Sequence, residues 1–312
     1  MNRTKLLLIT GAHGSNKHRP NAKFFRDDVL PFLEENVVRG GMRAALIYEI
    51  LHFDMIPTAP KSEQEMRTVL AQDGNRGRKN KEAVQAELTK IERLMTKDWR
   101  ETRDKGQPFM KVSLNWGFED VVLSINQTKP GQIAHYMEPQ SAETAYGFWA
   151  TEILWKEFVD ISQEEREARI NALIEYIRKL AEIQVHRDRL VFSLSERLRG
   201  EDPERAIIIP RGTAHRGMQV LFSDDKYDLT YKDAGYLLDF TDEAIARSYV
   251  DSLSTAELRK YAELELDYLR YWAVHRYSLR QILLKLFGST VVAEKELEKA
   301  ARDYALSQKM NS

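Results

Sequence analysis

The sequence predicts an α/β fold, with a central parallel or mixed sheet covered by helices on both faces and a helical C-terminal region. Three short segments are apolar throughout, which is typical of strands buried on both faces. They are Lys5–Thr10, Ala44–Ile50 and Ala206–Pro210. Longer stretches between and after them carry apolar residues at helical spacing. We expect a core domain over residues 1–238 and a helical region packed on it over residues 239–312.

Weaker patterns complete the expected sheet and mark the starts of three helices. Val112–Leu114 and Val121–Ile125 are strand candidates, and Gln219–Phe222 suits a strand or a helix. A serine followed three residues later by a glutamate is a capping box, which indicates a helix start. This pattern occurs at Ser62, Ser162 and Ser254. The second helix should bury one face, and the third should extend to about Phe287, before a last helix from Val291 to about Lys309.

The segment Gln72–Lys81 is basic and rich in Asp, Gly and Asn. These residues are typical of turns, so the segment is predicted to be an exposed loop. It is the best candidate for a mobile flap over a site. The sequence leaves open whether it folds over one.

The composition excludes several classes of protein. With 47 basic and 48 acidic residues among 312, the chain has no global field that would attract nucleic acid or anionic membranes. The absence of cysteine excludes disulfides, thiolate nucleophiles and cysteine-ligated zinc. The apolar run after Lys5 is too short for a signal peptide, and no uncharged run reaches the ~18 residues of a membrane span. We expect a cytoplasmic protein.

Two glycine-containing loops with a histidine each follow a predicted strand. His13 lies in Thr10–Ser15, after the first strand, and His215 lies in Pro210–Gly217, after the last. Ligands of open α/β sheets bind outside the carboxyl ends of strands, so both histidines are candidate catalytic residues. If the two strands are neighbours, both imidazoles should enter one crevice. The alternative is that they are turn histidines without a chemical role.

Two charged residues join these histidines as candidates. Glu49 closes the second predicted strand, where a buried carboxylate requires a partner or a ligand. Arg187 could bind a carboxylate or phosphate in bidentate fashion. The alternatives are a surface glutamate and a solvated arginine. Among the other histidines, His52 could join the site, His18 lies in the first loop, His135 lies in a lid or wall segment, and His275 suits packing.

The order of these motifs resembles the superfamily that joins erythromycin-esterase-like, ChaN-like and Tiki/TraB proteins. His13 matches the turn after the first strand, Glu49 the strand end, and Gly212-Thr213-Ala214-His215 the late turn. Arg187-Asp188-Arg189-Leu190 is similar to the family's Arg-Asp helix, and Phe24-Phe25-Arg26 to an aromatic-containing helix of the esterase branch. The resemblance covers roughly Leu6–Phe222 in scattered blocks, without residues 63–103. It implies a divalent-metal peptidase, a metal-independent hydrolase or a haem-iron binder, depending on the branch.

These observations predict a hydrolase of ester or peptide bonds with His13, Glu49, Arg187 and His215 as catalytic residues. The histidines would activate water as bases or, together with Glu49, as ligands of Mn, Zn, Fe or Co. Arg187 would hold negative charge on the substrate.

Two alternatives differ in class. The crevice could bind haem or a small anionic ligand without turnover. An aromatic stripe in the C-terminal region could instead bind a partner or a second copy of the chain, or simply pack on its own core. The stripe consists of Tyr261, Leu264, Tyr268, Leu269, Trp272 and Tyr277.

Overall fold

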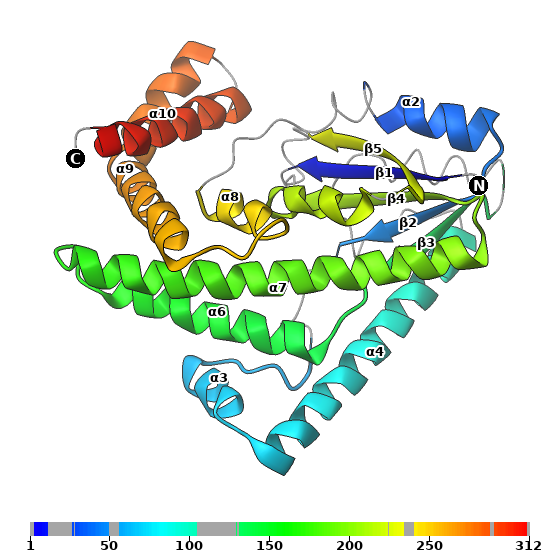
Figure 1. Ribbon diagram of the computed structural model, residues 1–312, viewed down its shortest axis with the longest axis horizontal. Coiled ribbons are helices and arrows are strands. Elements are labelled where there is room, and N and C mark those ends of the chain that lie inside the picture. Colours follow the sequence, from blue (N-terminus) through cyan, green and yellow to red (C-terminus); the bar gives the residue numbers. More distant parts are fainter. Residues whose placement is uncertain are drawn as a thin grey trace.

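The computed structural model is an α/β fold, as predicted (Figure 1). It describes residues 3–11, 27, 29–49, 56–104, 129, 131–223, 225–233, 240–287 and 290–310. Within them, five parallel strands form one sheet in the order β3-β2-β4-β1-β5. Their bounds are β1 Thr4–Gly11, β2 Ala44–Tyr48, β3 Ile133–Met137, β4 Ala206–Gly212 and β5 Tyr227–Asp233.

The three apolar segments of the sequence are β1, β2 and β4, which confirms the main strand predictions. Alternate residues of these strands enter separate cores on the two faces, because successive side chains of a strand point to opposite sides. On one face Leu7 and Leu46 pack against α2 (Leu30–Phe32) and the π-helix η2 (Leu33–Arg39). On the other, Leu6 and Ile47 pack against α7 (Arg166–Glu201) and the 3-10 helix η4 (Thr213–Phe222). Helices therefore cover both faces of the sheet.

The strands that precede the two histidine loops, β1 and β4, are neighbours in the sheet, which the sequence left open. The two strands are parallel neighbours, with Gly11 opposite Gly212 at their carboxyl ends. β3 and β5 were not expected as strands, since their exposed and buried positions are mixed. The segment Gln219–Phe222 lies within η4 and is helical. The strand candidates Val112–Leu114 and Val121–Ile125 lie outside the described residues.

The prediction of a loop over Gln72–Lys81 is wrong. Residues from Gly74 onward form α4 (Gly74–Asp104), which follows α3 (Glu63–Leu70). Asp73 precedes the helix and its carbonyl accepts a hydrogen bond from the Gly77 amide. Asp, Asn and Gly are favoured at helix starts as well as in turns, and the Arg and Lys residues that follow are good helix formers.

Two of the three capping boxes are confirmed. The Ser62 hydroxyl accepts from the Glu65 amide at the start of α3, and Ser254 and Glu257 bond reciprocally at the start of α9 (Thr255–Phe287). The third is wrong as a helix start. Ser162 lies in a turn in which its carbonyl accepts from the Glu165 amide, and α7 begins at Arg166. The helix still buries the predicted face with Ile170, Leu173, Ile174 and Ile177.

The C-terminal residues form α8 (Phe240–Arg247), α9 and α10 (Thr290–Met310). Figure 1 shows α9 and α10 side by side, away from the strands. Tyr261 and Leu269 of the predicted stripe pack against α7, beside α6 (Ala142–Asp160), while Leu264 and Tyr268 pack with Phe240 and Ala305. These described members of the stripe therefore contact helices of their own chain.

Candidate functional site

Polar residues gather at the carboxyl edge of the sheet. Glu49 directly follows β2, Glu138 directly follows β3, and Arg211 lies near the end of β4. The carboxyl ends of neighbouring parallel strands meet at one edge, so these side chains are brought together from distant parts of the sequence. All three are buried. The edge is therefore a closed group of charges that must satisfy one another.

His215 lies at the centre of this group. The turn from β4 into η4 places its imidazole between two carboxylates. Its Nδ1 lies 2.8 Å from both carboxylate oxygens of Asp188, and its Nε2 lies 3.1 Å from Oε1 of Glu49. Each ring nitrogen thus faces an oxygen that can only accept a hydrogen bond when ionised. An imidazole that donates from both nitrogens carries a positive charge.

The electrostatics of the site agree with that protonation state. Burial alone would lower the pKa of His215, but Asp188 and Glu49 outweigh it and raise the pKa to about 9. Burial would likewise raise the pKa of Glu49, yet His215, Arg187 and Arg211 hold it well below its usual value. At neutral pH the pair is therefore an imidazolium and a carboxylate.

A second layer of ion pairs fixes these groups. Nε of Arg187 donates to Glu138 over 2.7 Å, and an Nη of the same guanidinium lies 3.4 Å from Glu49. The other oxygen of Glu138 accepts from Arg211. The Gly212 amide donates to Oε2 of Glu49 over 2.8 Å. The three carboxylates thus face two guanidiniums and one imidazolium, so the named charges of the cluster balance when His215 is protonated.

Helix α7 and the C-terminal region hold this layer in place. Gln184, Arg187 and Asp188 are three and four residues apart on α7, so they share the helix face that turns toward the sheet edge. The side-chain oxygen Oε1 of Gln184 accepts from Nη1 of Arg187 over 2.8 Å. The Tyr249 hydroxyl, from beyond α8, donates to Asp188. Residues of the predicted C-terminal region therefore contribute to the site of the core.

One guanidinium of the cluster keeps an unused donor. The Nη2 atom of Arg211 is buried and has no hydrogen-bond partner among the described residues. The Nε atom of the same residue lies 3.8 Å from Asp188. A buried N–H group without a partner costs free energy unless a ligand or water satisfies it. Arg211 is therefore the member of the cluster best suited to bind an oxygen of a substrate.

The structure brings together three of the four predicted residues, Glu49, Arg187 and His215. His13 lies outside the described residues, as do His18 and His52. The rings of His275 and Tyr271 lie 4.3 Å apart between their centroids. His135 of β3 stacks on Tyr48 of β2. The sequence did not single out Glu138, Arg211 and Tyr249, and it noted Asp188 only within the Arg187–Leu190 motif. Glu138 follows β3 as Glu49 follows β2, but β3 was not predicted as a strand.

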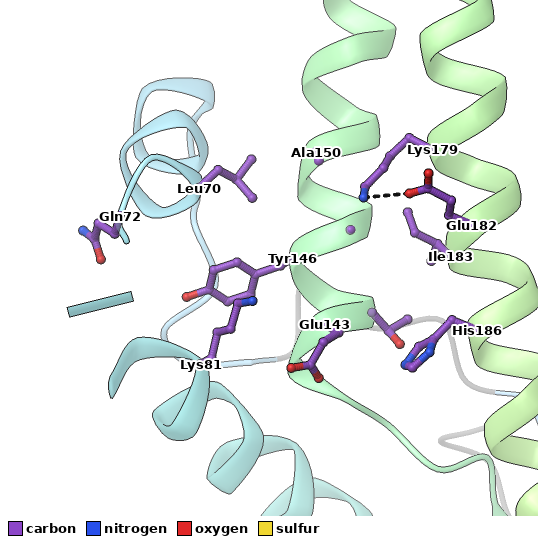
Figure 2. Close-up of a pocket in the computed structure, with 12 residues that line it drawn as sticks. Leu70, Gln72, Lys81, Glu143, Tyr146, Ala150, Lys179, Glu182, Ile183 and His186 are labelled. Carbon is purple, nitrogen blue, oxygen red and sulfur yellow. Dashed lines mark hydrogen bonds and ion pairs between the residues drawn. The ribbon is translucent and has the colours of Figure 1, made fainter. Parts of the chain in front are cut away.

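A cavity of about 470 Å³ lies between α3, α4, α6 and α7, beside this cluster (Figure 2). Lys81 of α4 reaches over the ring of Tyr146, with Nζ 5.4 Å from its centroid. His186, which precedes Arg187 on α7, lines the same cavity and lies 3.2 Å from the Ser141 hydroxyl. The basic segment that was expected to be a flap is thus part of a helical cavity wall.

Comparisons with known proteins do not place the chain in a family. No protein-family model matches it, and no curated protein or solved structure matches it. The superfamily resemblance stays a prediction. Among the helices of the described ranges, none combines the length and apolar character needed to cross a membrane.

Proposed function

We propose that the chain hydrolyses an ester or peptide bond at the carboxyl edge of its sheet. The observation that carries the proposal is the His215 imidazole held between the Glu49 and Asp188 carboxylates. A histidine with both nitrogens engaged and a perturbed pKa, at a strand end, is a common basis for proton transfer in α/β enzymes. Charged side chains are seldom fully buried unless they are paired, and here the buried pairs surround one imidazole.

In this proposal His215 is the proton donor. Its Nε2 proton passes to the leaving oxygen or nitrogen as the bond from the substrate carbonyl carbon breaks. Glu49 and Asp188 hold the ring in position and stabilise its charged form. A general base must take one proton from the attacking water, whose oxygen bonds to that carbon. His13 is the proposed base, because Gly11, two residues before it, is paired with Gly212 next to the cluster.

The geometry supports a different division of roles between the arginines than the sequence predicted. Arg187 donates to Glu138, Gln184 and Glu49, so it serves to position Glu49. Arg211 keeps its Nη2 donor for the oxyanion that develops on the substrate carbonyl. Removing one such donor typically costs on the order of a hundredfold in kcat.

The donor set also fits a divalent metal ion in part. Glu49 Oε1 and His215 Nε2 lie 3.1 Å apart, close enough for both to bind one ion at ~2.0–2.2 Å. Asp188 at Nδ1 is the usual outer partner of a metal-binding imidazole. Within the described ranges no group of three such ligands occurs, so His13 would complete the set. A bound ion would supply a water molecule with its pKa lowered toward ~7.

Hydrolysis of a panel of nitrophenyl esters and short peptides, with added Mn²⁺ or Zn²⁺ and with chelator, tests the proposal. We expect turnover by the wild type and its loss in His215→Asn and Glu49→Gln. His186→Asn is the matched control, because His186 lies on α7 next to the cluster without joining it. Elemental analysis of the purified protein separates the metal-dependent and metal-free forms of the proposal. Unchanged kcat/KM in His215→Asn contradicts both forms.

A further inference from the structure

A second cavity lies between α7 and the segment that joins α8 to α9. Its volume is about 530 Å³, within the ~300–1,000 Å³ typical of small-molecule sites. α7 forms one wall, and the segment from the end of α8 to the start of α9 forms the other. The lining residues are Arg178, Ala181, Glu182, Val185, His186, Arg189, Ser248, Ser252, Leu253 and Leu258.

Arg189 is one of the charged residues that line this cavity. Arg189 follows Asp188 in the chain, and Ser248 precedes Tyr249, whose hydroxyl donates to Asp188. Arg189 and Ser248 both line the cavity. The Arg189 guanidinium forms no hydrogen bond or ion pair with any described residue, although the side chain lines the cavity. The Ser248 hydroxyl donates to the Ala244 carbonyl over 2.8 Å, so the Arg189 guanidinium is the donor that an anion in this cavity would meet.

The charge of the cavity is positive. Glu182 is its one acidic lining residue, and the Lys179 ammonium bonds to it over 3.0 Å (Figure 2). The two arginines of the lining are thus not neutralised from within the cavity, and Arg178 has an exposed partner, Glu175, on its own helix. Glu175 offsets the charge of Arg178, so Arg189 is the arginine of the lining that pairs with no described acidic residue.

Part of the cavity lining is apolar. Leu258 and the Ile174 and Ile177 side chains of α7 belong to one buried cluster, against which Leu253 packs. Ala181 and Val185 continue this surface along α7 toward Arg189. A ligand with an anion at one end and a compact apolar body at the other would match both parts.

We propose that this cavity binds a phosphomonoester with a compact apolar body, its phosphate bonded to Arg189. A guanidinium presents its N–H groups in a planar fork that matches phosphate oxygens in bidentate fashion. The proposal is independent of the hydrolytic function, since none of the residues that it uses takes part in that chemistry.

Isothermal titration calorimetry of the full chain with phenyl phosphate tests this site. We expect saturable binding that weakens about tenfold or more in Arg189→Gln, because charge-assisted hydrogen bonds contribute on that order. Arg197→Gln is the matched control, since Arg197 is exposed on the same helix but does not line the cavity. It should bind phenyl phosphate as the wild type does. Inorganic phosphate should bind more weakly, because it leaves the apolar wall uncovered.

Three results would overturn the proposal. The first is a wild-type chain that gives no saturable heat with phenyl phosphate. In the second, Arg197→Gln weakens binding as much as Arg189→Gln, which would indicate nonspecific attraction to a basic helix. The third is benzyl alcohol binding as tightly as phenyl phosphate, since the anion would then contribute nothing.

Discussion

Nε2 of His215 lies 3.1 Å from Oε1 of Glu49, although 166 residues separate the two in the chain. The contact joins the ends of β2 and β4, which are neighbours in the sheet. Burial would discourage charge on either group alone. Each is charged because the other is, and because Asp188, Arg187 and Arg211 complete the balance. The consequences of removing any one partner follow from this dependence.

Glu49→Gln should destabilise the protein by about 3–5 kcal/mol, since breaking a buried ion pair leaves an uncompensated charge. The amide would also weaken the bond from the Gly212 amide. Urea denaturation measures the free energy of unfolding. Glu152→Gln, at an exposed position of α6, should change it by no more than about 0.5 kcal/mol. Equal stability of the two variants would contradict the buried ion-pair account.

Stability should fall as the pH rises through about 9. The pKa of His215 is about 9 in the folded state and near ~6.5 in the unfolded state, so the folded state binds the proton more tightly. The resulting stabilisation is complete below pH ~6.5 and is lost as the pH rises through the folded pKa. It is on the order of a few kcal/mol. Urea denaturation between these pH values measures it. His215→Asn should lose this part of the slope, and His186→Asn, which retains His215, should keep it.

Tyr249→Phe removes the hydroxyl that donates to Asp188. We expect a loss of stability of about 1.5–3 kcal/mol, typical of a hydrogen bond to a charged group. Asp188 would then attract the His215 proton more strongly, so the alkaline limb of the stability profile should move to higher pH. Tyr304→Phe in α10 is the control. A Tyr249→Phe variant with wild-type stability and an unmoved pH profile would show that Tyr249 does not position Asp188.

Gly217→Ala tests the packing that holds Tyr249. A Cβ atom at residue 217 would lie 2.3 Å from Cδ2 of Tyr249 and 2.5 Å from the Ala246 carbonyl oxygen. Because backbone and ring must both shift, we expect destabilisation of about 1–3 kcal/mol. Gly200→Ala meets no atom within 4 Å and lies in α7, so it should be neutral or stabilising. Thermal denaturation compares the two, and similar effects on stability would rule out the close contact.

The core strands were predictable because hydrophobicity alone defines them. β1, β2 and β4 are buried on both faces, so their central residues are apolar, and the residues that follow them include Glu49 and His215. β3 was not predictable in this way, because three of its five residues are only partly buried. Glu138 was missed with it.

The other missed residues depend on tertiary contacts. Asp188 was noted only within the Arg187–Leu190 motif, and only the path of the 36-residue α7 along the sheet turns it toward His215. Tyr249 lies beyond the predicted core, where no local pattern connects it to Asp188. The basic segment before Lys81 was misread because the same residues favour turns and helix starts. Local sequence cannot decide between those outcomes.

The pKa and protonation of His215, followed by NMR of the ¹⁵N-labelled imidazole across a pH titration, test the central claim most directly. His215→Asn assigns the resonance, and Glu49→Gln should lower the measured pKa. The account predicts a ring protonated on both nitrogens at neutral pH, with a pKa of about 9. A neutral ring at pH 7, titrating near the ordinary ~6.5, would contradict the imidazolium bridge between Glu49 and Asp188.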